Sequence, residues 1–393
     1  MRPPQSNLGT CRVLVVDDNE ANRDVLSRRI QRQGHTVMMA FDGRQALLRL
    51  REQAFDLVLL DIMMPEVNGY QVLEEIKADP QLRHIPVIMI SAVDDVESVV
   101  KCIQLGAEDY LPKPFNPILL KARVSATLEK KRLRDQEQAY LKTVRQEMEL
   151  GRRIQADFLP AFLPLATGWE IAATFHPARE IAGDFYDAIA LPDERIGLVI
   201  ADVCDKGVGA ALFMALVRSL LRAFAEQAPP SDFAALNAVP LTNKYITQHH
   251  HNKQTHIHMF ATLFFGVLNP VTGNLTYING GHEAPLLLEP SGKIVPLEPT
   301  GPAVGLMGAS TFALAEAHFE PGSMLLAYTD GVTEARKAGG EMFGEERLLE
   351  LVKQPFSAGA ALMSQIEHSV RDYLADQPPA DDITMLTVQR IKA

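Results

Sequence analysis

Four aspartates in the second half of the chain each adjoin a short apolar run of the kind that forms a buried strand: Asp184, Asp202, Asp330 and Asp381. Carboxylates that converge repel one another unless a cation lies between them. Hard cations such as Mg²⁺ and Mn²⁺ take oxygen ligands, and Gly207 and Gly209 after Asp202 would let the backbone approach an ion. We therefore predict a site for two Mg²⁺ or Mn²⁺ ions. The plainer interpretation of the Asp202 segment alone is a strand, a turn capped by an aspartate, and a helix.

A second group of polar residues follows apolar runs in the first third of the chain: Asp17, Asp18, Asp61, Ser91 and Lys113. Those runs alternate with helical segments, which predicts a doubly wound parallel sheet with ligands beyond the carboxyl ends of its strands. Three clustered carboxylates require Mg²⁺, and a carboxylate can attack a phosphoryl group once the surrounding charge is neutralised. The alternative is a flavodoxin-like domain with an incidental acidic rim.

Three parts of the chain would position these residues. Residues 1–126 form an α/β doubly wound (flavodoxin-like) domain, with strands expected at 12–16, 36–40, 56–60, 85–90 and 109–111. Residues 127–160 form a long helical connector. Residues 161–393 combine many antiparallel strands with paired helices, which predicts an α+β sandwich.

The connector is predicted to be helical because residues 119–159 contain no proline, and Gly151 is their only glycine. Apolar residues recur at a/d spacing, although Gly151 and Gln155 interrupt the seam. A long helix with one apolar stripe favours a coiled coil and a parallel homodimer. The alternative is a single helix packed against its own domains.

Composition limits the classes of function. The net charge of −11 argues against a nucleic-acid surface, and the expectation is no membrane span, because uninterrupted apolar runs stay short of ~18 residues. The cytoplasm is the expected compartment. Three scattered cysteines indicate neither zinc nor disulfides. Histidines at 249–251, 256 and 258 suggest a solvated loop, with adventitious metal binding as the alternative.

The N-terminal constellation resembles the receiver domain of two-component response regulators. The resemblance implies that Asp61 accepts a phosphoryl group. It implies a Mg²⁺ site formed by Asp17, Asp18, Asp61 and the Met63 carbonyl. It further implies three switch residues: Ser91, which contacts the phosphoryl group, Tyr110, the aromatic switch, and Lys113, which pairs with the phosphoryl group.

The C-terminal motifs resemble metal-dependent serine/threonine phosphatases of the PPM type, in the SpoIIE/RsbU branch. They are Ile181-Ala-Gly-Asp-Phe-Tyr-Asp187, Asp202-Val-Cys-Asp-Lys-Gly207, Ala327-Tyr-Thr-Asp-Gly331 and Asp381-Asp-Ile-Thr-Met385. The resemblance implies that two metal ions activate a water for in-line attack on a phosphoserine or phosphothreonine. The implied ligands are Asp184, Asp202, the Val203 carbonyl, Asp330 and Asp381. Asp187 and Asp382 would lie outside the ligand set. The roles of Thr329, Gly183 and Gly331 would be to set the backbone geometry of the site.

Two departures from the family pattern concern the same site. Ala182 replaces the first glycine of Gly-Gly-Asp, and Cys204-Asp205 replaces Ser-Gly. A carboxylate at Asp205 could change metal affinity or hinder a phosphate. Because every metal aspartate is kept, an active phosphatase is the favoured expectation, and a metal-binding but feeble pseudo-enzyme is the alternative.

Together, the resemblances imply a response regulator, phosphorylated by a sensor histidine kinase, whose Asp61 controls a protein phosphatase. The implied substrate is a phosphorylated anti-sigma-factor antagonist of the STAS class, and the output is control of a stress sigma factor. The layout is also similar to RssB-type adaptors of pseudomonads, which deliver a sigma factor to a protease. Retained aspartates favour the enzyme, because an adaptor has no physical need for carboxylates that repel without metal.

Overall fold

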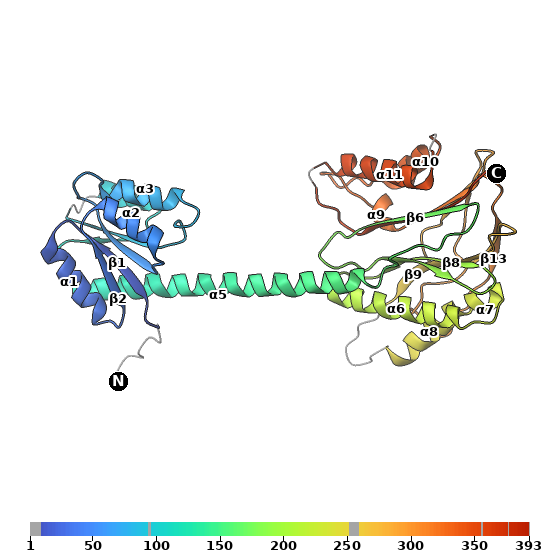
Figure 1. Ribbon diagram of the computed structural model, residues 1–393, viewed down its shortest axis with the longest axis horizontal. Coiled ribbons are helices and arrows are strands. Elements are labelled where there is room, and N and C mark those ends of the chain that lie inside the picture. The colour runs from blue at the N-terminus through green and yellow to red at the C-terminus, as the bar shows by residue number, and fades with distance from the viewer. Residues whose placement is uncertain (1–8, 93–95, 251–258, 355–356, 376, 393) are drawn as a thin grey trace. The chain divides into compact units, whose positions relative to one another are not determined.

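A computed structural model describes residues 9–92, 96–250, 259–354, 357–375 and 377–392 (Figure 1). The chain divides into two compact units, residues 1–144 and 145–393. Helix α5 (Pro117–Ala156) is continuous across that division. The domain boundaries expected at 126 and 160 remain predictions, and so does the homodimer.

The first unit is a five-stranded parallel sheet in the order β2-β1-β3-β4-β5. Its elements are β1 (Arg12–Val16), α1 (Glu20–Gln31), β2 (Thr36–Ala40), α2 (Gly43–Glu52), β3 (Leu57–Asp61), α3 (Gly69–Ala78), β4 (Val87–Ser91), α4 (Val96–Gln104) and β5 (Asp109–Pro112). The central strands are wholly buried because helices cover both faces, α1 and α5 on one, α2, α3 and α4 on the other. This is the doubly wound fold expected from the sequence.

The second unit stacks two five-stranded antiparallel sheets, β13-β10-β9-β8-β7 and β12-β11-β14-β15-β6. The strands are β6 (Trp169–His176), β7 (Phe185–Ala190), β8 (Ile196–Val203), β9 (Ala261–Leu268), β10 (Asn274–Gly280), β11 (Leu286–Leu288), β12 (Ile294–Pro296), β13 (Ala315–His318), β14 (Met324–Tyr328) and β15 (Ile383–Arg390). Apolar side chains from both sheets, such as Leu198 and Leu386, form one core between them.

Helices cover the outer face of each sheet. They are α6 (Val208–Glu226), α7 (Asp232–Leu236), α8 (Ala238–His249), α9 (Asp330–Thr333), α10 (Gly344–Val352) and α11 (Gly359–Leu374). Helices α6 to α8 pack on the first sheet, and α10 and α11 pack on the second. The expected α+β sandwich is confirmed.

Helix α6 is long and apolar enough to span a membrane, and among the described residues it is alone in that. Its buried residues, including Phe213 and Val217, lie in the core beside the first sheet. Arg218 on the same helix forms an ion pair with buried Asp187, 2.8 Å away. These contacts are those of a core helix.

Candidate functional site

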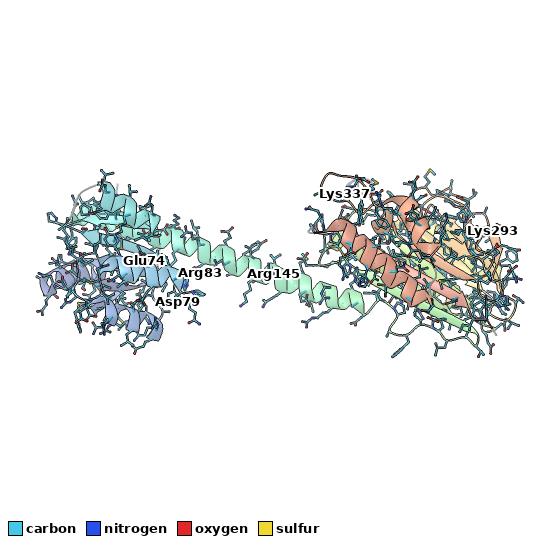
Figure 2. All side chains as sticks on the ribbon, turned by 90° about the horizontal axis from the view of Figure 1, so that it is seen from above. Glu74, Asp79, Arg83, Arg145, Lys293 and Lys337 are labelled. Carbon is cyan, nitrogen blue, oxygen red and sulfur yellow. The ribbon has the colours of Figure 1, made fainter. Side chains whose placement is uncertain are left out.

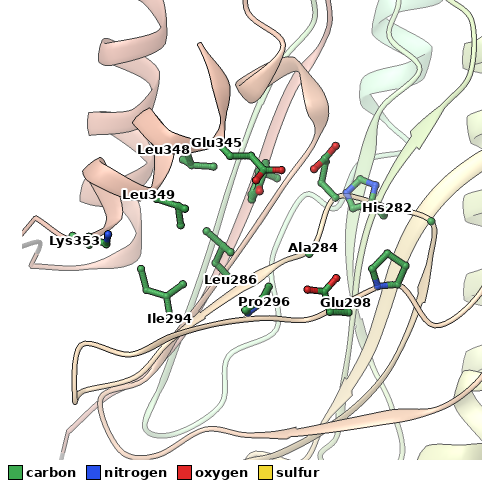
Figure 3. Close-up of a pocket in the computed structure, with 14 residues that line it drawn as sticks. His282, Ala284, Leu286, Ile294, Pro296, Glu298, Glu345, Leu348, Leu349 and Lys353 are labelled. Atoms are coloured by element: carbon green, nitrogen blue, oxygen red, sulfur yellow. The ribbon is translucent and has the colours of Figure 1, made fainter. Parts of the chain in front are cut away.

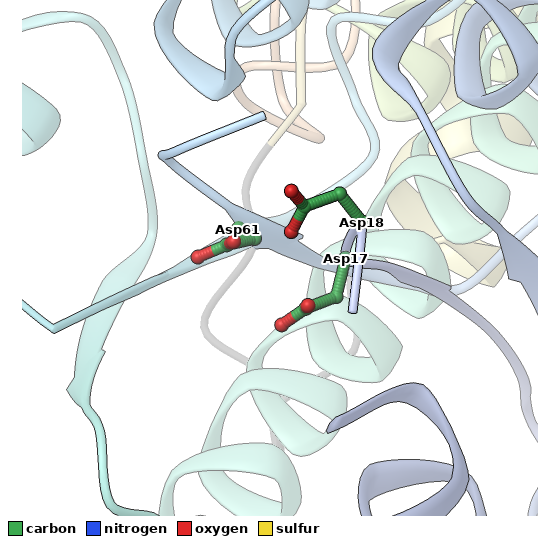
Figure 4. Close-up of side chains that lie close together, drawn as sticks. All are labelled: Asp17, Asp18 and Asp61. Carbon is green, nitrogen blue, oxygen red and sulfur yellow. The ribbon is translucent and has the colours of Figure 1, made fainter. Parts of the chain in front are cut away.

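The receiver carboxylates meet at the carboxyl ends of β1 and β3. Asp17 and Asp18 follow β1, Asp61 ends β3, and one oxygen from each lies within 4.8 Å of the others (Figure 4). Lys113 Nζ lies 2.8 Å from both Asp17 Oδ2 and Asp61 Oδ1. Burial, followed by the charges of Asp17 and Asp18, raises the pKa of Asp61 to about 6 despite Lys113. This all-oxygen, negatively charged cradle fits a Mg²⁺ ion.

The remaining receiver residues occupy the places that the parallel sheet dictates. Ser91 ends β4 and is buried. Tyr110 lies in β5, where its side chain belongs to the core on one face of the sheet. Met63 follows β3 and exposes its side chain, so only its backbone could face an ion. Metal binding by the Met63 carbonyl and the switch roles of Ser91 and Tyr110 remain predictions.

The C-terminal aspartates come from both sheets of the second unit. Asp184 precedes β7 and Asp202 lies in β8, whereas Asp330 follows β14 and Asp381 precedes β15. Strand β15 contacts β7 and β8, which brings these segments together. The structure thus gathers the four aspartates that the sequence singled out. Their oxygens are more dispersed than those of the receiver, since in the described part of the chain only the receiver triad meets the 4.8 Å limit.

Mutual repulsion dominates the electrostatics of this second cluster. Burial, then the charge of Asp330, raises the pKa of Asp202 to about 7. Burial, then the charge of Asp381, raises the pKa of Asp330 to about 6. Burial and the neighbouring Asp202 raise the pKa of Asp184 well above its ordinary value. The donor set consists of oxygens with excess negative charge, which fits hard divalent cations.

Asp184 is the most enclosed of the four carboxylates. Its Oδ2 accepts hydrogen bonds from the hydroxyls of Thr329 and Thr384, each 2.7 Å away. Both hydroxyls are buried, so they fix the orientation of this carboxylate. The sequence had suggested only a backbone role for Thr329, and nothing in its pattern singled out Thr384.

Close backbone approaches hold the same loops. A Cβ on Gly331 would lie 1.9 Å from the Asp382 carbonyl oxygen, and one on Gly183 would lie 3.0 Å from the Val203 carbonyl oxygen. The Asp382 carboxylate accepts from the backbone N–H of Gly183 at 2.8 Å and of Ala178 at 2.7 Å. Asp382 therefore ties the Gly183 loop to the start of β15.

Asp187 is occupied by two arginines of α6. Its oxygens lie 2.8 Å from Arg218 Nη2 and 3.0 Å from Arg222 Nη1. Burial raises the pKa of Asp187 although both cations oppose that change. The carboxylate thus anchors α6 to β7.

Lys206 is the only cation paired with any of the four clustered aspartates in the described ranges. Its Nζ lies 2.7 Å from Asp381 Oδ2 and donates to the Ala380 carbonyl at 2.5 Å. The departures lie nearby. Cys204 Sγ accepts from the Phe260 N–H at 3.2 Å, and the exposed Asp205 accepts from the Lys206 N–H at 2.8 Å. Asp205 thus adopts its positive φ of 72° in a turn stabilised by its own side chain.

Gln155, at the end of α5, is a site residue that the sequence did not identify as functional. Its Nε2 donates to the Ala182 carbonyl at 2.6 Å, and its Oε1 accepts from the Ala182 N–H at 3.0 Å. The side chain is buried. It therefore fixes the backbone two residues before Asp184. The available signal was a polar residue at a seam position of an otherwise apolar stripe.

The structure describes two histidines of the predicted loop. His249 ends α8 and His250 is its C-terminal cap. His251, His256 and His258 lie outside the described residues.

Comparison with known protein families finds a match for each half of the chain. The model of the family described as Stage II sporulation protein E (SpoIIE) matches residues 192–391. The chain belongs to the SpoIIE family. The response regulator receiver model matches residues 13–125, so a receiver domain precedes the SpoIIE-type phosphatase-family domain.

Similar proteins match parts of this chain. Protein IcfG of Synechocystis sp. is 45% identical over an alignment of 268 residues, and the match covers 63% of this chain and 42% of that protein. Response regulator PleD of Caulobacter vibrioides is 37% identical over 145 residues, 37% of this chain and 30% of that protein. The chain spans less than half the length of these curated relatives. The SiaA-PP2C domain of Pseudomonas aeruginosa shares the fold, with a TM-score of 0.50 and 20% identity over 64% of this chain and 98% of that one.

Proposed function

We propose that this chain is a response regulator in which phosphorylation of Asp61 controls a metal-dependent serine/threonine protein phosphatase. The observation that carries the proposal is the cluster of Asp184, Asp202, Asp330 and Asp381, which has one paired lysine and in which the pKa values of Asp184, Asp202 and Asp330 are raised. Four acids gathered with so little compensation destabilise the fold unless cations bind.

Asp184, Asp202, Asp330, Asp381 and the Val203 carbonyl would hold two Mg²⁺ or Mn²⁺ ions. Bound there, such ions supply Lewis acidity and lower the pKa of water. The protein orients its own ligands beforehand. The hydroxyls of Thr329 and Thr384 hold Asp184, and the narrow contact at Gly183 holds the Val203 carbonyl.

The receiver has the groups for phosphoryl transfer to Asp61. Asp17, Asp18 and the Met63 carbonyl would complete a Mg²⁺ site with Asp61, and Mg²⁺ there neutralises the incoming phosphoryl charge. Lys113, already 2.8 Å from Asp61, would pair with the phosphoryl group. Ser91 and Tyr110 would respond to it, and the phosphoryl donor would be a sensor histidine kinase.

Helix α5 supplies a physical connection to the output. It begins at Pro117, places Leu120, Val124 and Leu128 in the receiver core, and carries Gln155 near its other end. Any change in the position of Gln155 must disturb its two hydrogen bonds to Ala182, and through the loop, Asp184. Pairing of α5 with a second copy, through its half-exposed apolar stripe, would be one way to set that position.

The proposed substrate is a phosphorylated STAS-type anti-sigma-factor antagonist in the cytoplasm, with stress sigma-factor control as the result. Membership of the SpoIIE family supports this assignment. The test is phosphate release from a seryl-phosphorylated antagonist by the full chain with Mn²⁺, with and without beryllofluoride, beside Asp61→Asn. Release that responds to beryllofluoride only in the native chain supports the proposal. Bound Mn²⁺ with no release in either state would favour the RssB-type adaptor.

A further inference from the structure

The second unit contains a cavity of about 700 Å³ beside the loop that follows β10 (Figure 3). The loop residues Gly281 to Ala284 form one wall, β11 and β12 supply Leu286 and Ile294, and α10 supplies Leu348 and Leu349. A cavity of this size is large enough to hold a long side chain of a bound partner. The established motifs of the chain assign it no role.

The cavity adjoins the phosphatase cluster. Tyr328, which lines it, lies two residues before Asp330. The charge of Glu283, after burial and the charges of Asp381 and Glu334, contributes to the raised pKa of Asp330. In the same loop as Glu283, His282 Nδ1 lies 3.0 Å from Thr262 Oγ1, and Thr262 pairs with Asp202 across strands β8 and β9. A group bound here would therefore be close to the reacting phosphate.

The charges around the cavity are unequally distributed. Glu283, Glu298 and Glu345 line it, and none of them has an ion pair within the described residues. Figure 3 shows Glu298 and Glu345 toward the His282 end and Lys353 at the other end, with Leu349 and Ile294 between. One end is thus acidic, and an apolar wall leads to it.

His282 closes the acidic end of the cavity. The side chain is 3% exposed, and its ring contacts the Thr262 hydroxyl on one side and the Tyr328 backbone on the other. Carboxylates beyond an apolar wall suit a cation on an aliphatic stem.

We propose that this cavity binds an arginine side chain of the phosphoprotein substrate, close in sequence to the phosphorylated residue. Arginine fits better than lysine because its fork of five N–H groups can reach several carboxylates together. The inference rests on the proposed phosphatase function and extends it to substrate choice.

The test measures binding, so that it does not depend on turnover. Full chain with Mn²⁺ is titrated against fluorescent peptides that carry a phosphonate analogue of phosphoserine. In this peptide series, a single arginine occupies each of about four positions on either side of the phosphonate residue. Each peptide has a counterpart in which uncharged citrulline, which has the same shape, replaces the arginine. The site variant is Glu298→Gln with Glu345→Gln. The matched control is Glu346→Gln, which changes an exposed charge next to the site on the same helix.

At one or more positions, native chain and Glu346→Gln should bind the arginine peptide about fivefold more tightly than its citrulline counterpart. The site variant should bind both equally. The inference would be overturned if the native chain bound the arginine and citrulline peptides with nearly equal affinity, or if the site variant kept the native preference for arginine. Loss of one bound Mn²⁺ in the site variant would also overturn it. Hydrolysis of p-nitrophenyl phosphate, which lacks arginine, reports separately on the proposed function and should be equal in all three proteins.

Discussion

Replacing Gln155 with leucine tests whether the end of α5 holds the Asp184 loop. The two side chains have similar size, but leucine can neither donate to the Ala182 carbonyl nor accept from the Ala182 N–H, now 2.6 and 3.0 Å away. Both backbone groups are then left buried without partners. At roughly 1–2 kcal/mol for each group, the change costs about 2–4 kcal/mol. A cost of about 2 kcal/mol lowers the population of the native loop by about 30-fold.

The assay is a Mn²⁺ titration of p-nitrophenyl phosphate hydrolysis by the full chain, with and without beryllofluoride. Gln155→Leu should need at least about tenfold more Mn²⁺ and should lose any response to beryllofluoride, because loop order and metal binding are linked. Gln146→Leu, an exposed position on the same helix, is the control and should behave as native. A native Mn²⁺ requirement together with a native beryllofluoride response in Gln155→Leu would refute the reasoning.

Two further predictions concern buried carboxylates. Asp187→Asn removes the anion that pairs with Arg218 and Arg222, and it should lower the free energy of unfolding of the second unit by about 3 kcal/mol in denaturant unfolding. The control, Asp193→Asn at an exposed position, should change this free energy little. Equal stabilities of the two variants would show that the ion pairs of Asp187 are unimportant. In the metal-free receiver, the pKa of Asp61 is raised to about 6, so the protonated carboxyl favours the folded state and stability should fall as pH rises from about 4 to 6. Thermal unfolding should show this fall, and Asp61→Asn should reduce it; a slope unaffected by the substitution would contradict the assignment to Asp61.

Sequence patterns predicted the receiver fold and the grouping of its carboxylates with Lys113, because each of these residues lies at or just after the end of a strand. In a parallel sheet the carboxyl ends of the strands lie at one edge, and the strand order places β1, β3 and β4 side by side, so Asp17, Asp61 and Ser91 lie near one another. The structure confirms that convergence for the three carboxylates and Lys113. The fold class of the second unit was equally accessible, since alternating strands and paired helices imply layers.

The supporting contacts of the phosphatase cluster were not accessible in the same way. Thr384 reaches Asp184 across 200 positions of sequence, and Gln155 reaches Ala182 across 27. Such contacts depend on which strands of two antiparallel sheets become neighbours, and local periodicity carries no information on that pairing. A buried glutamine in a helical seam can be recognised from sequence as unusual, but its partner cannot.

The most direct test of the two-metal account is Mn²⁺-dependent hydrolysis of p-nitrophenyl phosphate by the full chain, beside Asp330→Asn and the exposed control Asp193→Asn. The account predicts activity in the native chain and the control, and a loss of at least about 100-fold in Asp330→Asn with unchanged thermal unfolding of the receiver. Absence of hydrolysis in the native chain despite bound Mn²⁺, or full activity in Asp330→Asn, would contradict it.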